Sequence, residues 1–165
     1  MIRTLTHTLT AGLCILMLSP FALAQDRAQD REAINELMWH YARALDTFNP
    51  DAYVAAYTED GQFGASATAT KGHEALWQMI EDLRTGREAR AADGNPAAPM
   101  YHMNTDVWID FVDDTHALHH SYWLTVNGAG GGNPANVVAA GRGVDHLVKV
   151  DGEWLIQIRD VAPQD

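Results

Sequence analysis

The stretch HLVKVDGEWLIQIRDV, residues 146–161, contains two runs of alternating apolar residues that are joined by Asp151-Gly152. Alternation with a period of two is typical of half-buried β-strands, and an Asp-Gly pair between two such runs is a strong signal for a two-residue hairpin turn. The stretch therefore predicts two antiparallel strands at the end of the chain, at roughly 136–150 and 153–162.

The same alternation continues upstream, where it predicts strands at roughly 102–112 and 115–127. Before residue 100 the period is helical, with apolar residues three and four positions apart. A first helix starts near Asp30, and either Asp26 or Asp30 can cap it. Asn49-Pro50 ends this helix and caps a second one, because Asn suits the cap and Pro the first helical position. A short strand is expected around Phe63. KGHEALWQMIEDL predicts a third helix, and the polar stretch RTGREARAADGNPAAP predicts a long loop after it.

Helices followed by hairpin-joined strands indicate the α+β class. We expect a cone-shaped α+β barrel, in which a curved antiparallel sheet carries the N-terminal helices on its concave face. Such a cone is open at one end and so forms a pocket.

The first 24 residues have the features of a secretory signal peptide: a short polar start, an apolar run and Ala22-Leu23-Ala24 as an A-x-A cleavage pattern. We therefore expect residues 25–165 to form a single domain that is periplasmic or secreted, with no stable membrane insertion after cleavage. The only cysteine, Cys14, leaves with the signal. The formal net charge of −11 disfavours nucleic acid as a partner.

Four polar residues stand where the apolar pattern predicts an interior: Tyr41, Asp46, His102 and Arg159. Taken singly, each is more simply a satisfied structural residue. The apolar residues of strand 102–112 are odd-numbered, whereas His102 is even-numbered, so a regular strand would point His102 away from the pocket. A β-bulge near 104–106 would turn it inward.

The segments AINELMWHYARALDTFNPDAYVAAYTEDGQF, KGHEAL, HMNTDVWI and VDGEWLIQIRDV resemble the SnoaL-like superfamily, which shares the nuclear transport factor fold. The superfamily includes scytalone dehydratase, bile-acid dehydratase, hexachlorocyclohexane dehydrochlorinase and ketosteroid isomerase. The pattern is most similar to the dehydratase and dehydrochlorinase branch. There an aspartate ending the first helix pairs with a histidine after the long loop, and an arginine in the last strand completes the set.

This resemblance implies catalytic roles for Tyr41, Asp46, His102 and Arg159, with Tyr41 as a proton donor to a leaving oxygen. A histidine moves protons near neutral pH, a carboxylate orients it, and arginine stabilises a developing anion. The implied function is a cofactor-independent lyase or isomerase that acts on a small, mainly apolar molecule. Asp106 departs from the pattern, since relatives often carry Asn there. A non-catalytic exported protein that binds a small molecule is the alternative.

Further candidates are expected to line the pocket as substrate-binding residues: Tyr57, Trp77, Asp106 and His119. A zinc site would need several histidines to converge, but there is no His-x-His pair or HExxH helix, so neither metal nor cofactor is expected. The adjacent His119 and His120 must point to opposite faces of a strand, and one of them should line the pocket. Trp108 and Trp123 on the outer sheet face would favour a homodimer or higher homo-oligomer.

Overall fold

The computed structural model describes residues 20–130 and 133–163 of the chain, and within them it contains three helices and six strands. Their order is α1 (Pro20–Asp46), α2 (Pro50–Ala55), β1 (Tyr57–Phe63), β2 (Thr70–Lys71), α3 (His73–Ala92), β3 (Met100–Phe111), β4 (His116–Asn127), β5 (Asn136–Val150) and β6 (Glu153–Asp160).

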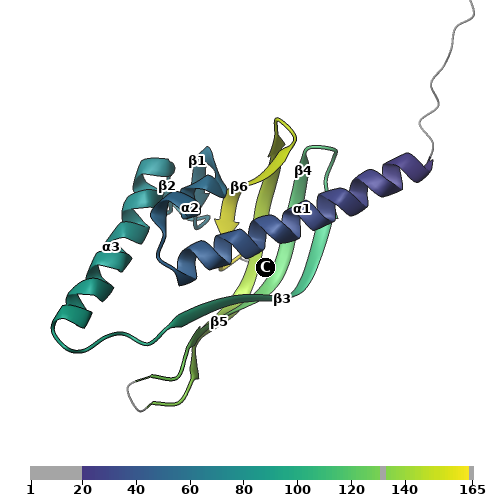
Figure 1. Cartoon of the computed structure of the whole chain (residues 1–165). Helices are drawn as coiled ribbons and strands as arrows, with labels where there is room; N and C mark the ends of the chain where they lie inside the picture. Colours follow the sequence, from purple (N-terminus) through teal and green to yellow (C-terminus); the bar gives the residue numbers. More distant parts are fainter. Residues whose placement is uncertain (1–19, 131–132, 164–165) are drawn as a thin grey trace, which may run out of the picture.

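The strands form one curved, open sheet in the order β2-β1-β6-β5-β4-β3, and α1 lies across its concave face (Figure 1). The predicted α+β fold, with helices on the concave face of a sheet, is confirmed. The long strands pair in antiparallel fashion, but β1 runs parallel to β6, so the sheet is mixed. No hairpin signal could reveal this pairing, because the remainder of the sheet separates β1 from β6 in the sequence.

The short-range predictions at turns and caps are confirmed. Asp151 and Gly152 both have positive φ angles, of 52° and 91°, as a two-residue hairpin turn requires. The Asn49 side chain accepts a hydrogen bond from the backbone N–H of Ala52, and Pro50 is the first residue of α2. Asp151-Gly152 thus determines where the chain reverses between β5 and β6, and Asn49-Pro50 determines where α2 begins.

The predicted long loop at 84–99 is mostly wrong, because α3 continues to Ala92. Arg84 pairs with Glu81 and Glu88, one turn away on either side, and such pairs support a solvent-exposed helix. The connection to β3 is therefore only residues 93–99. Arg87 ties it down by donating hydrogen bonds to the carbonyls of Ala97 and Ala98.

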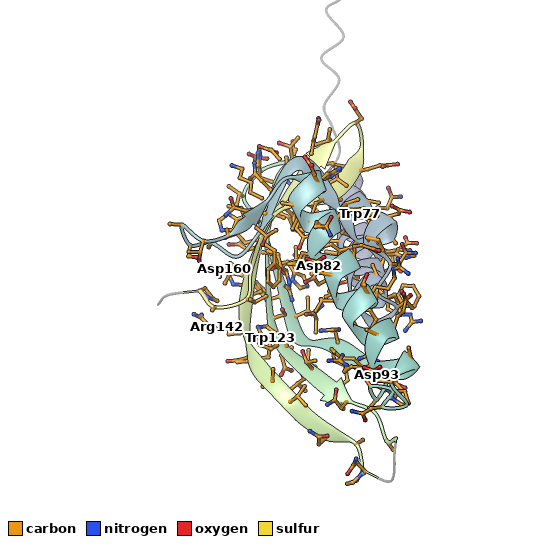
Figure 2. The ribbon with its side chains drawn as sticks, turned by 90° about the vertical axis from the view of Figure 1, so that its left-hand side faces the viewer. Trp77, Asp82, Asp93, Trp123, Arg142 and Asp160 are labelled. Carbon is orange, nitrogen blue, oxygen red and sulfur yellow. The ribbon has the colours of Figure 1, made fainter. Side chains whose placement is uncertain are left out.

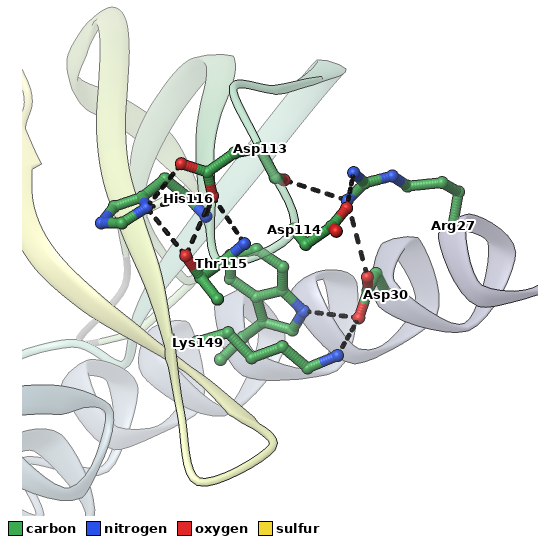
Figure 3. Close-up of polar contacts among 8 residues, drawn as sticks. Arg27, Asp30, Asp113, Asp114, Thr115, His116 and Lys149 are labelled. Carbon is green, nitrogen blue, oxygen red and sulfur yellow. Dashed lines mark hydrogen bonds and ion pairs between the residues drawn. The ribbon is translucent and has the colours of Figure 1, made fainter. Parts of the chain in front are cut away.

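The predicted start of the first helix near Asp30 is also wrong, since α1 begins at Pro20. Instead of capping the helix, the buried Asp30 accepts hydrogen bonds from Lys149 Nζ at 2.6 Å and Trp154 Nε1 at 2.9 Å. Arg27, one turn earlier, donates to Asp114 (Figure 3). This polar cluster fastens α1 to the β3–β4 turn and to the β5–β6 hairpin.

Most of the expected signal peptide lies outside the described residues, so cleavage after Ala24 stays a prediction. None of the helices in the described part of the chain has both the length and the apolar composition needed to cross a membrane.

Candidate active site

A cavity of about 320 Å³ opens between the helices and the concave face of the sheet. Its volume is at the lower end of the range for small-molecule sites. The walls are mainly apolar, with a few polar groups among them. The lining residues are Tyr41, Leu45, Tyr53, Phe63, Met79, Ile80, Leu83, His102, Met103, Asn104, Trp123, Leu124, Thr125, Ala139, Arg159 and Val161.

Asp46, the last residue of α1, and His102 in β3 are in direct contact. Asp46 Oδ1 accepts hydrogen bonds from the backbone N–H of His102 at 2.8 Å and from its ring Nδ1 at 2.9 Å. A carboxylate can only accept, so Nδ1 carries the hydrogen, and in the neutral imidazole Nε2 then keeps its lone pair. Arg43 Nη1 lies 3.4 Å from the other oxygen, Oδ2. One carboxylate thus fixes the backbone, the ring orientation and the tautomer of His102.

β3 contains the bulge that an inward-facing His102 requires, and this bulge decides where His102 points. Thr105 pairs with Tyr122, but Trp108 already pairs with His120, so β3 has one extra residue there. Asp106 takes the left-handed conformation, with φ of 49°. The even-numbered residues face inward before this bulge and the odd-numbered ones after it, which reconciles His102 with the buried Ile109.

A second bulge, in β6, positions Arg159. Ile156 pairs with Leu147 of β5, whereas Ile158 pairs with the adjacent residue, His146, so β6 also has one extra residue. In a regular strand an even-numbered and an odd-numbered residue lie on opposite faces. Because of the extra residue, the odd-numbered Arg159 lies on the same inward face as the buried, even-numbered Ile156. Sequence alternation alone would have placed Ile158 inside and Arg159 outside.

The Arg159 guanidinium is buried and bonded on two sides. Nη1 donates to Asp145 Oδ2, and Nη2 donates to Asn104 Oδ1 at 3.1 Å. Its carbon Cζ lies 5.1 Å from the centroid of the Tyr41 ring. Burial by itself lowers the pKa of Arg159, but the Asp145 carboxylate and the Tyr41 hydroxyl raise it by more than burial lowers it. The net pKa lies above the ordinary value for arginine, so the guanidinium stays charged.

Three tyrosines pack together beside this arginine, with their rings tilted or edge-on to one another. The rings of Tyr41, Tyr53 and Tyr57 have centroids 5.2–6.1 Å apart, and the hydroxyls of Tyr53 and Tyr57 are 3.0 Å apart. Burial raises the pKa of both Tyr53 and Tyr57 well above the usual value for tyrosine. Both therefore keep their protons at neutral pH and remain hydrogen-bond donors.

The eight residues singled out from sequence fall into two groups. Tyr41, His102 and Arg159 line the cavity, and Asp46 bonds His102. The other four do not line it.

Each of these four has a structural reason to be elsewhere. Tyr57 lies behind Tyr53, with its hydroxyl 3.0 Å from that of Tyr53. Asp106 is exposed at the bulge. Trp77 of α3 donates a hydrogen bond to Asp51 Oδ1 of α2 at 2.7 Å. Figure 2 shows Trp77 well apart from the cavity residue Trp123. His119 is buried on the inner face, and it shares with His102 the lining of a second hollow of about 480 Å³, between α1 and β3.

Trp123 was expected on the outer face but lies inside. Its indole N–H donates to the carbonyls of Arg142 and Val161, and the ring packs over Gly141, where a Cβ would lie 2.5 Å from it. The inward residues of β4 are odd-numbered, so Trp123 shares the face of His119, and His120 lies on the other face opposite Trp108.

Sequence reasoning missed three polar residues of this site: Tyr53, Asn104 and Asp145. The position of Asp145 could have been predicted to be buried, because it alternates with Gly143 and Leu147 on one face of its strand. Its partners could not be read, since they depend on the register of three strands. Within residues 20–130 and 133–163, no group of three or more His, Cys, Asp or Glu side chains could hold a metal ion.

The chain belongs to the SnoaL-like domain family, whose family model matches residues 26–160. This finding confirms the resemblance noted from the sequence. A comparison with curated protein sequences gives no match.

Solved structures of similar fold agree with this assignment. A provisionally named scytalone dehydratase from Novosphingobium aromaticivorans is 25% identical, with a TM-score of 0.66 over 83% of this chain and 85% of that one. An NTF2-like protein with a cystatin-like fold from the same species is 20% identical, with a TM-score of 0.71 over 92% of both chains. LinA is 18% identical, with a TM-score of 0.65 over 83% of this chain and 87% of that one. The last two comparisons show a shared fold alone.

Proposed function

We propose that this protein is a cofactor-independent lyase or isomerase that acts on a small, mainly apolar molecule in the cavity. The observation that carries the proposal is the Asp46–His102 hydrogen bond at a cavity that Arg159 also lines. The family membership and the similarity to a provisionally named scytalone dehydratase support the same class of reaction.

His102 acts as the general base in this proposal. Nε2 removes a proton from a carbon of the substrate, and the electrons of the broken C–H bond form a new double bond or an enolate. The imidazolium that results is stabilised by Asp46, which already holds Nδ1–H at 2.9 Å. Because the backbone N–H of His102 binds the same oxygen, the ring loses little freedom when it reacts.

Arg159 and Tyr41 act on the oxygen or halide side of the substrate. In an elimination, Tyr41 gives a proton to a departing hydroxide, which leaves as water, while a halide leaves as the anion beside Arg159. In an isomerisation, the same groups stabilise the enolate until His102 returns its proton to another carbon. Tyr53 supplies a further neutral donor, because its pKa is raised by burial.

The test is turnover of hydroxylated or halogenated carbonyl compounds and terpenoids, screened for elimination or isomerisation. Replacement His102→Ala should reduce the rate roughly 10²–10⁴-fold, the usual contribution of a positioned base. The matched control is His120→Ala, which removes a histidine from the opposite face of the sheet. A folded His102→Ala variant that turns over a confirmed substrate at the parent rate would show that the base is assigned wrongly.

The alternative is a binding protein that holds the same class of molecule without reaction. The observation favouring it is that Arg159 is already engaged by Asp145 and Asn104. A compound that binds in the cavity with micromolar affinity, and is recovered unchanged after long incubation with the parent protein, would support binding over catalysis.

A further inference from the structure

A buried row of three charged or ionisable side chains crosses the sheet behind the cavity. His119 of β4 is directly opposite Asp145 of β5, and Asp145 is directly opposite Arg159 of β6. All three point to the concave side, and their exposed fractions are 1%, 0% and 3%. The register of the antiparallel strands therefore builds the row residue by residue.

One oxygen of Asp145 holds both neighbours. Oδ2 accepts a hydrogen bond from His119 Nδ1 at 2.9 Å and another from Arg159 Nη1. The other oxygen, Oδ1, has no hydrogen-bond partner in the described part of the chain. An unpartnered buried carboxylate oxygen destabilises a fold, so the acid at this position carries a cost that only its bonds through Oδ2 offset.

The charge of this acid matters to the cavity. Arg159 is the only lysine or arginine among the described residues that line the cavity. Its Nη2 reaches Asn104, two residues from His102 on the same inward face of β3. An uncompensated guanidinium at this place would oppose the positive charge that His102 acquires when it accepts a proton.

We propose that Asp145 is a positioning residue, which orients Arg159 and His119 and cancels the charge of Arg159 beside the base. The proposal rests on the proposed function in that it treats His102 as the base. Asp145 touches no part of the cavity itself and acts through Arg159.

Several other titratable or charged groups face His102 or its surroundings, and the test of this proposal must leave them unchanged. They are Tyr41, Arg43 and Asp46 of α1, Tyr53 of α2, and His119 of β4. From α3 the cavity receives only apolar side chains: Met79, Ile80 and Leu83.

The experiment follows the histidine ring signals of the purified protein by NMR as the pH changes, in the parent, Asp145→Asn, Arg159→Gln and the double variant. Asp145→Asn leaves Arg159 unopposed, so the titration midpoint of His102 should fall by on the order of one pH unit. The double variant removes both charges and should return the midpoint close to the parent value. In Arg159→Gln, the positive charge that pairs with Asp145 is gone, and His119 becomes the remaining partner of this carboxylate. His119 should therefore gain a proton at higher pH than in the parent.

His116, which is half-exposed at the β3–β4 turn, is the internal reference and should titrate alike in all four proteins. A folded Asp145→Asn protein with an unchanged His102 midpoint would overturn the proposal. No substrate is needed, so this outcome is independent of whether the protein is an enzyme.

Denaturant unfolding of the same four proteins tests the proposal where a single variant folds poorly. If Asp145 and Arg159 compensate each other, the double variant should lose less stability than the sum of the two single losses. Additive losses would show that the two charges are not coupled, and would also overturn the proposal.

Discussion

At the scale of single residues, Asp46 is the group on which the position of His102 depends. The same oxygen receives the backbone N–H and the ring Nδ1–H of His102, at 2.8 and 2.9 Å. Asp46 is thus both a structural anchor for the start of β3 and the orienting partner of the imidazole. Asp46→Asn removes the charge but keeps an acceptor, because an amide oxygen also has two lone pairs and can still accept both hydrogen bonds.

We predict that Asp46→Asn lowers the rate on a confirmed substrate roughly 10²–10⁴-fold while the protein stays folded, because the imidazolium loses its counter-charge. The measurement is kcat/KM beside circular dichroism. Combined with His102→Ala, the loss should be little larger than that of His102→Ala alone, since the two residues act as one unit. Losses that multiply would contradict the pairing.

At the scale of elements, two bulges decide which face of a strand each candidate residue occupies. The extra residue in β3 turns His102 inward, and the extra residue in β6 does the same for Arg159. Bulges of this kind re-aim side chains near functional sites. The site therefore depends on irregularities in two strands that are otherwise regular.

Asp106 occupies the left-handed conformation at the β3 bulge, with φ of 49°, which aspartate tolerates and a β-branched residue does not. We predict that Asp106→Val lowers the free energy of unfolding by roughly 1–2 kcal/mol, as measured by urea denaturation. Asp106→Gly is the matched control and should cost far less, because glycine adopts this conformation freely. Equal losses in both variants would show that the side chain, not the backbone, matters here.

The Asp30 cluster joins α1 to the β5–β6 hairpin, and it predicts a pH-dependent contribution to stability. Asp30→Ala leaves the buried indole N–H of Trp154 without its partner and should cost about 1–3 kcal/mol near pH 7. Burial alone would raise the pKa of Asp30, but hydrogen bonds from Lys149 and Trp154 lower it below its ordinary value.

A lowered folded-state pKa means that this contribution is present above about pH 4 and is lost as the pH falls through the folded value. Thermal unfolding at several pH values should therefore show the gap between the parent and Asp30→Ala closing below about pH 4. The control is Asp114→Ala, which removes an exposed partner of Arg27 and should cost at most about 1 kcal/mol. A gap that persists in acid would count against the ionised state of Asp30.

At the scale of the whole molecule, the outer face of the sheet carries large apolar side chains. Trp108 is 65% exposed and Tyr122 is 57% exposed, on the neighbouring strands β3 and β4. Trp123, which the sequence suggested for this face, lies inside, so Tyr122 rather than Trp123 accompanies Trp108. Contiguous exposed apolar patches on a soluble protein often mark sites of protein–protein contact.

We predict that the protein is a homodimer or larger assembly through this outer face. Light scattering at micromolar concentration should give a mass of at least two chains, and Trp108→Glu should reduce it. Trp39→Glu is the matched control, because Trp39 is similarly exposed but belongs to α1 on the helical side. A monomeric parent protein at this concentration would contradict the prediction.

Local sequence signals determined the parts of this protein that depend on short-range physics. Asp151-Gly152 specified a hairpin because its turn needs two positive φ angles, and Asn49-Pro50 specified a helix start because Asn caps and Pro fits the first turn. Alternation located the four long strands, since one face of each packs against the helices. The end of α3 escaped this reasoning, because its last turns are polar and are stabilised by ion pairs.

Only the tertiary structure decided which distant residues meet. The parallel pairing of β1 with β6 and the row from His119 through Asp145 to Arg159 depend on strand register, which no local pattern encodes. The inward position of Trp123 depends on the parity of β4 and on the space above Gly141. The physical reason is common to all: a strand alternates its faces residue by residue, so one inserted residue or one step of register exchanges inside and outside.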